Sequence, residues 1–525
     1  MRNRTNLLMA FFALLTGLTV ALGACGGGGG GGTPSPGPTP GTQATMTGQV
    51  LGTTFVAVDA STNTIVGSAA ATGSPGTFSM QVPIGKNYKF YLLENEGTPS
   101  QRLYPLYVQN QNQSRNVFSV GQARTINLGF MNTIPGFAVS ALGLQQMQAL
   151  GMNAVSFDST VPGTYTGTAF SNTLLDGAWN MHGLADNGHW FHQKMTVSSG
   201  SAAFANFTSS GAVGNRATMT MNMMPGGVMN SPDSADFNAF MGHLHELLVG
   251  TDVVSGQNQM FIAEKAPTPG TAFAIGNMTG TWQTQGIING PNYNGWMQGP
   301  VVIDGSGNIT PSSNLHRNDG TAFTITGPAV VDASSGTVTM AGVPSFHGTM
   351  NQGKDRIIAT MTDASGNSAL VVMQKSTATN HSNADFAGTW YMHNLGVGAA
   401  DRNDFGPAHF DSSGNGMMQR SSTSPGFINA TPFSFQMRMD NTGMMSSVGG
   451  FSGMMPGGMM GGNMPGSPGG GGMPGGGMMP GPGGSPVAGF SGFMSDGNDL
   501  LIVNLSQTVG GVQKDQDQNL MILQK

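Results

Sequence analysis

Methionine is the most unusual chemical feature of this sequence. The 525 residues include 39 methionines but only one cysteine. A tract at 449–484 consists almost entirely of Gly, Met and Pro, and its methionines are Met454, Met455, Met459, Met460, Met464, Met473, Met478 and Met479. Thioether sulfur is a soft ligand that selects Cu(I) over harder ions. The tract is therefore a candidate copper-binding segment.

The same tract also has a purely compositional interpretation. No cluster of His or Cys lies nearby to complete a metal site, and the motif at Met223–Gly227 returns at Met454–Gly458, which indicates expansion of a turn. A segment of this composition cannot bury a core, so the sequence predicts a disordered loop. We favour this interpretation and keep copper binding as the alternative.

Histidines form a second group that could bind a metal. His182, His189 and His192 lie close together in the sequence, and His243 and His245 follow. Two residues at i and i+2 on a strand share a face, so the last two could ligate zinc. Neither of them recurs at the equivalent positions of the internal repeat described below. We therefore expect the histidines of this sequence, these and the others in the repeats, to be solvated turn or strand residues rather than ligands of a metal site.

No motif for catalysis is present in the sequence. There is no Gly-x-Ser-x-Gly nucleophile motif, and no Gly-x-x-x-x-Gly-Lys-Ser/Thr phosphate loop. The 25 acidic residues show no pattern that pairs two carboxylates, and the single thiol lies at the end of an N-terminal leader. The sequence therefore predicts a protein that is not an enzyme.

That leader has the layout of a secretory signal, with Arg2 and Arg4 before an apolar stretch from Leu7 to Ala24. The residues Leu22–Cys25 (LGAC) resemble the lipobox of bacterial lipoproteins. The resemblance implies a signal peptide at 1–24 and a lipidated Cys25 that anchors the mature protein, with a Gly/Pro-rich tether at 25–44. It also favours the outer membrane, because the residue after the cysteine is not Asp. The alternative is an ordinary cleaved signal with an incidental thiol.

Composition restricts the partners of the mature chain. Charged residues make up only 8% of the sequence, against about 25% in ordinary soluble domains. Loss of the leader leaves 17 of the 19 basic residues beside 25 acidic ones, a net charge of −8. So few cations on an acidic protein argue against binding to nucleic acid. The expected partners are the membrane, through Cys25, and an unknown partner at the cell surface.

Residues 45–135 are expected to form a β-sandwich. Thr54–Val58 precedes an Asp/Asn turn at Asp59–Asn63, and Gly76–Val82 and Tyr88–Leu92 alternate apolar and polar residues in whole or in part. This order resembles carboxypeptidase-regulatory or transthyretin-like domains, which implies a non-catalytic spacer or adhesive unit. A connector at 136–172 follows, with a helix expected within 137–152.

The rest of the chain is an internal repeat of three units, at 173–266, 278–376 and 385–525. The units open on a shared Gly-x-Trp and close on a shared Glu/Gln-Lys: Gly177–Trp179, Gly280–Trp282, Gly388–Trp390, Glu264–Lys265, Gln374–Lys375 and Gln524–Lys525. The third unit is longer, because the Met-rich tract is inserted in it.

Each unit holds about eight short strand candidates, which suits a small antiparallel barrel. The opening Gly-x-Trp resembles the first strand of lipocalins and avidins. The resemblance implies a calycin-like barrel in which Trp179, Trp282 and Trp390 pack at one end. An open two-sheet arrangement is the alternative. The predicted fold class is all-β, an N-terminal β-sandwich followed by three small antiparallel β-barrel-like repeats.

One polar position recurs in the first strand of the units. His182 corresponds to His393 in the third unit and to Gln285 in the second. The predicted function is a non-enzymatic structural or interaction role for a cell-surface lipoprotein. The alternatives are Cu(I) binding by the Met-rich tract, or binding of a small apolar ligand in a barrel cavity. The second alternative predicts a cavity lined by Phe323, Ile325 and Val330.

Overall fold

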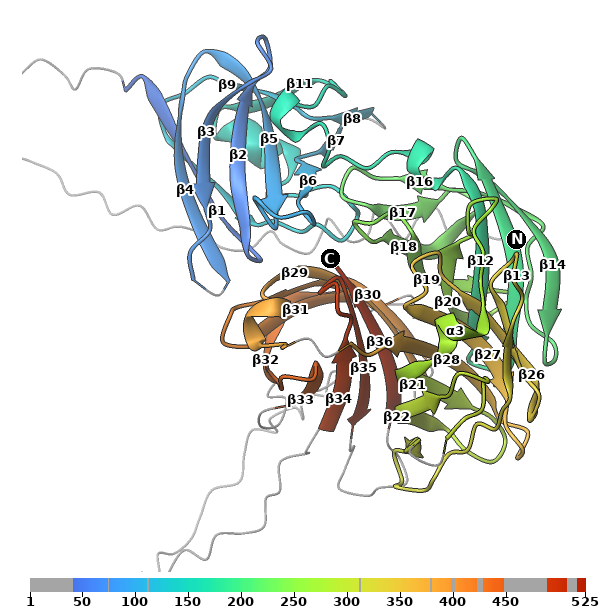
Figure 1. Cartoon of the computed structure of the whole chain (residues 1–525). Helices are drawn as coiled ribbons and strands as arrows, with labels where there is room; N and C mark the ends of the chain where they lie inside the picture. The colour runs from blue at the N-terminus through green and yellow to red at the C-terminus, as the bar shows by residue number, and fades with distance from the viewer. Residues whose placement is uncertain are drawn as a thin grey trace, which may run out of the picture. The chain divides into compact units, whose positions relative to one another are not determined.

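The all-β class that the sequence predicts is confirmed, and the helices among the described residues are short and lie between strands. The computed structural model describes residues 41–525, except 74, 111–112, 311–312, 378–379, 398–401, 423–427, 448–488 and 508–516. Residues 42–525 form one compact unit. Its sheets correspond to an N-terminal sandwich and to three repeats, and the strands can be followed in Figure 1.

The sandwich is built from two facing sheets. Its strands are β1 (Gln43–Val50), β2 (Thr53–Asp59), β3 (Thr64–Ala70), β4 (Gly76–Pro83), β5 (Lys86–Glu94), β6 (Arg102–Pro105), β7 (Val108–Asn110), β8 (Gln113–Arg115), β9 (Val117–Val120), β10 (Thr125–Phe130) and β11 (Met152–Ser156). One sheet has the order β10-β1-β4, and the other has the order β11-β9-β5-β2-β3, with β6 paired to β5. Strands β7 and β8 pair with each other in a separate two-stranded sheet.

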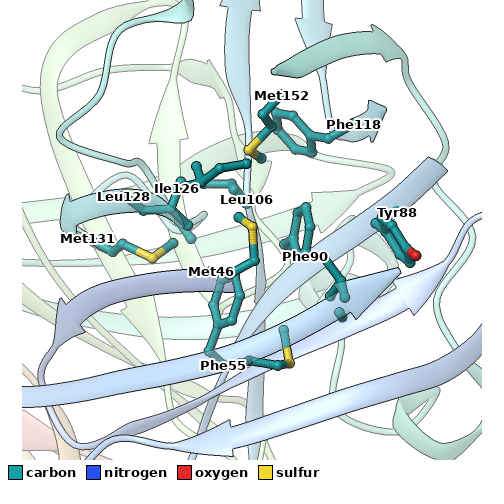
Figure 2. Packing of buried hydrophobic residues seen from close by; sticks show 14 of the residues in the cluster. Met46, Phe55, Tyr88, Phe90, Leu106, Phe118, Ile126, Leu128, Met131 and Met152 are labelled. Carbon is teal, nitrogen blue, oxygen red and sulfur yellow. The ribbon is translucent and has the colours of Figure 1, made fainter. Parts of the chain in front are cut away.

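Alternation of side chains explains this core. In β4, Phe78, Met80 and Val82 are buried while the residues between them are exposed. Figure 2 shows Phe55, Phe90 and other apolar side chains gathered within this cluster.

The strand β11 comes from the range that the sequence assigned to a connector. The expected helix is shorter than its range, because α2 spans only Leu144–Ala149. The 3₁₀ turns η1 (Gly163–Tyr165) and η2 (Asn172–Leu175) lead to the first repeat.

The first repeat is a nine-stranded sheet that nearly closes on itself. Its strands, in sheet order, are β15 (Thr218–Thr220), β14 (Ser201–Ser209), β13 (Trp190–Ser198), β12 (Gly177–Ala185), β20 (Gln257–Lys265), β19 (Leu247–Val254), β18 (Ser234–Met241), β17 (Val228–Ser231) and β16 (Asn222–Met223). The two ends of this order, β15 and β16, are separated by Met221 alone.

The second repeat is an eight-stranded sheet. Its strands, in sheet order, are β23 (His316–Arg317), β22 (Gly295–Ile303), β21 (Gly280–Asn289), β28 (Ser368–Lys375), β27 (Arg356–Thr362), β26 (Val343–Met350), β25 (Thr337–Met340) and β24 (Ala329–Val331). The short helix α3 (Ile275–Met278) precedes β21. Strands β23 and β24 form the two ends of the sheet and do not pair with each other. The second repeat is therefore a nearly closed barrel whose end strands do not pair, and not the open two-sheet arrangement considered as the alternative.

The third repeat is a closed barrel, as the sequence predicts. Its strands, in order around the barrel, are β29 (Gly388–Val397), β30 (Arg402–Phe410), β31 (Asn415–Ser422), β32 (Ile428–Met439), β33 (Met444–Ser447), β34 (Gly489–Met494), β35 (Leu500–Gln507) and β36 (Asp517–Gln524). The 3₁₀ turn η3 (Asn383–Phe386) precedes it. Pairing of β29 with β36 closes the wall.

The three repeats contact one another in a cyclic order. Strands β12 and β13 of the first repeat pack on β27 and β28 of the second, β21 and β22 pack on β35 and β36 of the third, and β29 and β30 pack on β19 and β20 of the first. Each repeat thus presents its first two strands to the last two strands of the next. A head-to-tail contact of this kind forms a ring when it closes after a fixed number of copies.

A shared apolar cluster fills the contacts between the repeats. It consists of Leu184, Trp190, Leu247, Val249, Met260, Ile262, Ile287, Ile358, Leu370, Val372, Leu395, Val397, Leu500, Ile502, Leu520 and Ile522. All three repeats contribute to this cluster from the outer faces of their strands. The burial explains why these strands read as nearly continuous apolar runs, whereas a strand with one wet face would alternate.

A buried arginine joins the sandwich to the repeats. Arg102 of β6 donates hydrogen bonds to the backbone oxygens of Gly226 (2.9 Å), Met241 (2.8 Å) and Lys525 (2.9 Å). Its guanidinium lies over the rings of Phe170 and Phe240, at 4.4 and 4.1 Å from their centroids. The sandwich is thereby bonded both to the first repeat and to the end of the third.

Candidate functional site

The tryptophans of the repeat signature are packing residues, as their resemblance to calycins implied. Trp179, Trp282 and Trp390 are buried, and each indole N–H donates to a backbone oxygen four residues earlier, at 2.8, 2.6 and 2.7 Å. The terminal lysine of each repeat covers the same ring: the ammonium groups of Lys265, Lys375 and Lys525 lie 5.4, 5.6 and 4.7 Å from the ring centroids. The shared opening and closing motifs therefore meet in one structural cap, and no ligand is needed to explain them.

The recurring polar position of the first strand crosses to the next repeat in all three cases. His182 Nε2 lies 3.1 Å from the hydroxyl of Thr349 in the second repeat. The Gln285 amide donates to Ile502 O (2.6 Å) in the third repeat. His393 Nε2 lies 3.0 Å from Asn238 Oδ1 in the first. All three residues are almost completely buried, so the expectation of a solvated strand histidine is wrong for His182 and His393.

Three imidazoles gather where the first repeat meets the second. The ring of His192 lies 6.0 Å from that of His182 and 4.5 Å from that of His347, and Trp190 lies 5.0 Å from His347. Burial, together with the neighbouring imidazoles, lowers the pKa of His182 to about 3 and that of His192 to about 4. These histidines are therefore neutral at pH 7 and contribute to the joint as polar, uncharged groups.

Metal binding finds no support among the described residues. No group of three His, Cys, Asp or Glu side chains within them is placed to hold a metal ion. His243 and His245 lie in the turn between β18 and β19, not on a strand, so the zinc geometry considered for them is wrong. The predicted copper ligands Met454, Met455, Met459, Met460, Met464, Met473, Met478 and Met479 lie outside the described residues, as does Cys25.

A groove on the incompletely closed side of the second repeat has the size of a ligand-binding site. A cavity of about 480 Å³ lies between residues 308–310 and 313–315 on one side and residues 322–327 on the other, and Val301 of β22 also lines it. This volume is within the range of small-ligand pockets, about 300–1,000 Å³. Two residues that the sequence predicted for a cavity, Phe323 and Ile325, do line it.

The lining of this groove is neutral and mixed in polarity. Its apolar side chains are Val301, Ile309, Leu315, Ala322, Phe323 and Ile325, and its polar ones are Asn308, Thr310, Ser313, Asn314, Thr324 and Thr326. No charged side chain belongs to this set. The third predicted residue, Val330, is 54% exposed and does not line the groove. The prediction of Val330 is wrong because this side chain is exposed on β24, three residues past Gly327 at the end of the groove.

Contacts of Arg317 stabilise one end of the groove. Arg317 of β23 forms an ion pair with Asp363 at 2.7 Å, and its guanidinium lies 4.5 and 5.3 Å from the ring centroids of Tyr293 and Phe323. Phe323 also donates its backbone N–H to Leu315 O at 2.8 Å. The two walls of the groove are therefore joined at this end and separate beyond it.

The opening of the groove could not be located from the sequence, although a signal was present. The stretch Thr310–Asn314 (TPSSN) and the turn at Asn318–Gly320 interrupt the apolar alternation of the second repeat. In the third repeat the corresponding strands β31 and β32 are long and paired. A count of strand candidates treats both cases alike, because it does not test whether neighbouring candidates are long enough to pair.

Comparison with known proteins gives fold neighbours only. No protein-family model and no curated protein matches the chain. Among solved structures, the chain is similar to the isotype 1 transferrin binding protein B of serogroup B Neisseria meningitidis, with 8% identity, 93% of this chain and 78% of that chain covered, and a TM-score of 0.23. A transferrin binding protein B variant from Haemophilus parasuis Hp5 gives 9% identity, 66% and 75% coverage, and a TM-score of 0.24.

A third solved structure is a protein of unknown function from the DUF3598 family of Nostoc punctiforme. It has 8% identity and a TM-score of 0.19, with 47% of this chain and 96% of that chain covered. Scores at this level carry no inference about a site or a partner. Among the described residues, no helix is both long and apolar enough to span a membrane.

Proposed function

We propose that this protein is a non-enzymatic binding lipoprotein of the bacterial outer membrane, anchored through Cys25, and that it binds its partner in the groove of the second repeat. The observation that carries the proposal is the difference between the repeats. The apolar interior of each repeat is filled by its own side chains, and the outer faces are used in the joints between repeats. The groove lies at the edge of the second repeat's interior: its apolar base is part of that cluster, whereas Asn314, Thr324 and Thr326 in its lining are exposed.

The character of the groove favours binding over catalysis. Its lining offers hydroxyl, amide and apolar groups but no carboxylate, imidazole, amine or thiol. Such a surface can recognise a neutral partner by shape and hydrogen bonds. It supplies no group that could act as a general acid, a general base or a charged nucleophile near neutral pH.

Methyl NMR of the mature protein tests this proposal. The δ1-methyl groups of Ile309 and Ile325 report on the groove, while those of Ile262 and Ile522 in the joints between repeats serve as internal controls. A set of small uncharged compounds and neutral peptides is screened. We expect at least one of them to shift the groove signals and leave the controls unchanged. If no compound or peptide shifts Ile309 or Ile325, the protein is a structural spacer and the proposal fails.

Lipid anchoring is tested separately in cells. Metabolic labelling with a clickable fatty acid is expected to label the wild-type protein and not the Cys25→Ala variant, since the thiol is the acylated group. The wild-type protein is expected in the outer-membrane fraction. Equal labelling of both proteins would contradict the assignment of Cys25, and no labelling of either would remove the lipoprotein part of the proposal.

A further inference from the structure

The groove of the second repeat has one wall with the backbone of a strand but without a partner strand. Residues 323–327 alternate between buried and exposed: Phe323 and Ile325 are 6% and 5% exposed, whereas Thr324 and Thr326 are exposed. This period of two is that of a β-strand with one face on a core. The segment nevertheless belongs to no strand of the sheet.

The backbone hydrogen bonds of this segment are missing. Within the part of the chain that the structure describes, the N–H and C=O groups of Thr324, Ile325 and Thr326 have no hydrogen-bond partner. The backbone bonds stop at Phe323, which donates to Leu315, and resume at Ala329, which donates to Gly307 O at 2.8 Å. An unpaired strand edge of this kind is a template for pairing with another extended chain.

The third repeat shows what normally occupies this position. There β31 and β32 pair from Asn415 with Gln436 to Met418 with Phe433, and again at Arg420 with Asn429 and Ser421 with Ile428, with an irregularity in register between the two stretches. In the second repeat the two walls are hydrogen-bonded at both ends of the groove, by Phe323 N–H to Leu315 O and by Ala329 N–H to Gly307 O, and the cavity of about 480 Å³ lies between these bonds. The groove therefore lies at a place where a closed barrel has two neighbouring, paired strands of its wall.

We propose that this groove binds an extended, uncharged polypeptide segment of a partner protein, which adds as a strand to residues 323–327. The inference rests on the binding function proposed above and names the class of its partner. The unpaired backbone selects an extended chain, because main-chain hydrogen bonds supply the affinity in strand addition. The neutral lining selects a segment without charged side chains, since a buried unpaired charge would be costly.

Strand geometry identifies the amide that the partner must use. Successive N–H groups of a strand point to opposite sides, so the Ile325 N–H points to the same side as the Phe323 N–H. That side faces the other wall of the groove, because Phe323 donates to Leu315 there. We therefore expect the partner to accept a hydrogen bond from Ile325 and not from Thr324 or Thr326.

The test uses a neutral peptide of alternating character, with the sequence of residues 336–342 (GTVTMAG) and blocked ends. Its matched control carries N-methyl groups on alternate residues, which keep the side chains but remove backbone donors. Calorimetry and amide hydrogen exchange are measured on the mature full-length protein. We expect binding of the plain peptide, slowed exchange at Ile325 but not at Thr324, and affinity at least about tenfold weaker for the N-methylated peptide, as loss of two hydrogen bonds implies.

A matched pair of protein variants places the peptide. Asn314→Trp fills the groove from an exposed lining position and is expected to abolish binding. Val330→Trp adds the same side chain outside the groove and is expected to leave binding unchanged. Both variants must keep the wild-type melting temperature.

Four outcomes would overturn the inference: no binding of the plain peptide, equal binding of both peptides, no effect of Asn314→Trp on binding, or self-association of the chain through this edge. Binding of a small compound without the peptide would leave the binding function standing and reject strand addition alone.

Discussion

The second and third repeats begin and end alike but differ in the middle. Strands β21 and β29 carry the same Gly-x-Trp, and the same lysine ends β28, as Lys375, and follows β36, as Lys525. Between them, β23 and β24 have two and three residues, whereas β31 and β32 have eight and twelve. One repeat is therefore incompletely closed and the other is closed.

The difference follows from which strands contact a neighbouring repeat. The first two and last two strands of every repeat lie in the joints between repeats, and these are long in all three. The third and fourth strands have no such role in the second repeat. We infer that contact with neighbouring repeats constrains the length of the strands at the joints, whereas the strands away from the joints can differ in length between repeats.

The largest expected effects are losses of stability at the tryptophan–lysine caps, and they test whether the cap stabilises the second repeat as much as it stabilises the third. Trp282→Ala and Trp390→Ala each remove a buried indole together with the lysine contact above it. We expect each variant to lower the free energy of unfolding by about 3–5 kcal/mol. Urea titration followed by circular dichroism measures both. A loss below about 1 kcal/mol for Trp282→Ala alone would mean that the second repeat does not depend on its cap.

The joint between the first two repeats differs from the others in one ion pair. Arg356 contacts Glu264 at 2.8 Å, and both are buried. Leucines occupy the matching place in the other repeats, at Leu247 and Leu500, each paired in register with the residue before the terminal lysine. We expect Arg356→Leu to cost about 3–5 kcal/mol, because it leaves a buried carboxylate without a partner.

The double variant Arg356→Leu with Glu264→Gln gives this joint the residues of the others. We expect it to recover most of the stability lost in the single variant, since no buried charge is then left unpaired. The same urea titration measures it. A double variant no more stable than Arg356→Leu alone would contradict the equivalence of the three joints.

Acid weakens the two joints that contain histidine. Burial lowers the pKa of His182 and of His393 to about 3, while unfolded histidine titrates near 6.5. The unfolded state therefore binds more protons below pH 6.5, and stability is complete above that pH and falls as the pH decreases toward 3. Each histidine contributes a slope of about 1.4 kcal/mol per pH unit.

Glutamine occupies this position at the joint between the second and third repeats. Replacing both histidines by glutamine therefore isolates the effect of their protonation on stability. The double variant His182→Gln and His393→Gln places at both positions the glutamine found at Gln285. Unfolding free energies of wild type and variant are compared between pH 7 and pH 5. As the pH falls, we expect the unfolding free energy of the wild type to decrease more than that of the variant. If the difference in unfolding free energy between the two proteins does not change with pH, these histidines do not take up protons on unfolding.

The smallest expected effect lies at the groove. Asn314→Trp changes an exposed side chain and removes no backbone hydrogen bond, so we expect unfolding free energy within about 0.5 kcal/mol of wild type. Thermal unfolding measures it. A loss above about 2 kcal/mol would mean that the space filled by the new side chain is part of the packed core rather than a groove.

The sequence predicts the all-β class, the repeat and the packing role of Trp179, Trp282 and Trp390, because these depend on local alternation and on motifs that recur. It does not predict the groove, because pairing between β31 and β32 or its absence at residues 323–327 depends on strands that meet only in the folded sheet. The burial of His182 was also missed. A recurring polar residue indicates a shared role, but only the contact with Thr349 shows that the role lies between repeats.

Hydrogen exchange of the mature protein, with and without the neutral peptide, tests the central claim most directly. In the free protein we expect the amides of Thr324, Ile325 and Thr326 to exchange rapidly and those of Met417 and Met418 in β31 to be protected. The peptide should then slow exchange at Ile325. Equal protection of the two segments in the free protein would contradict an incompletely closed second repeat, and an unchanged rate at Ile325 with the peptide bound would contradict its use as a binding edge.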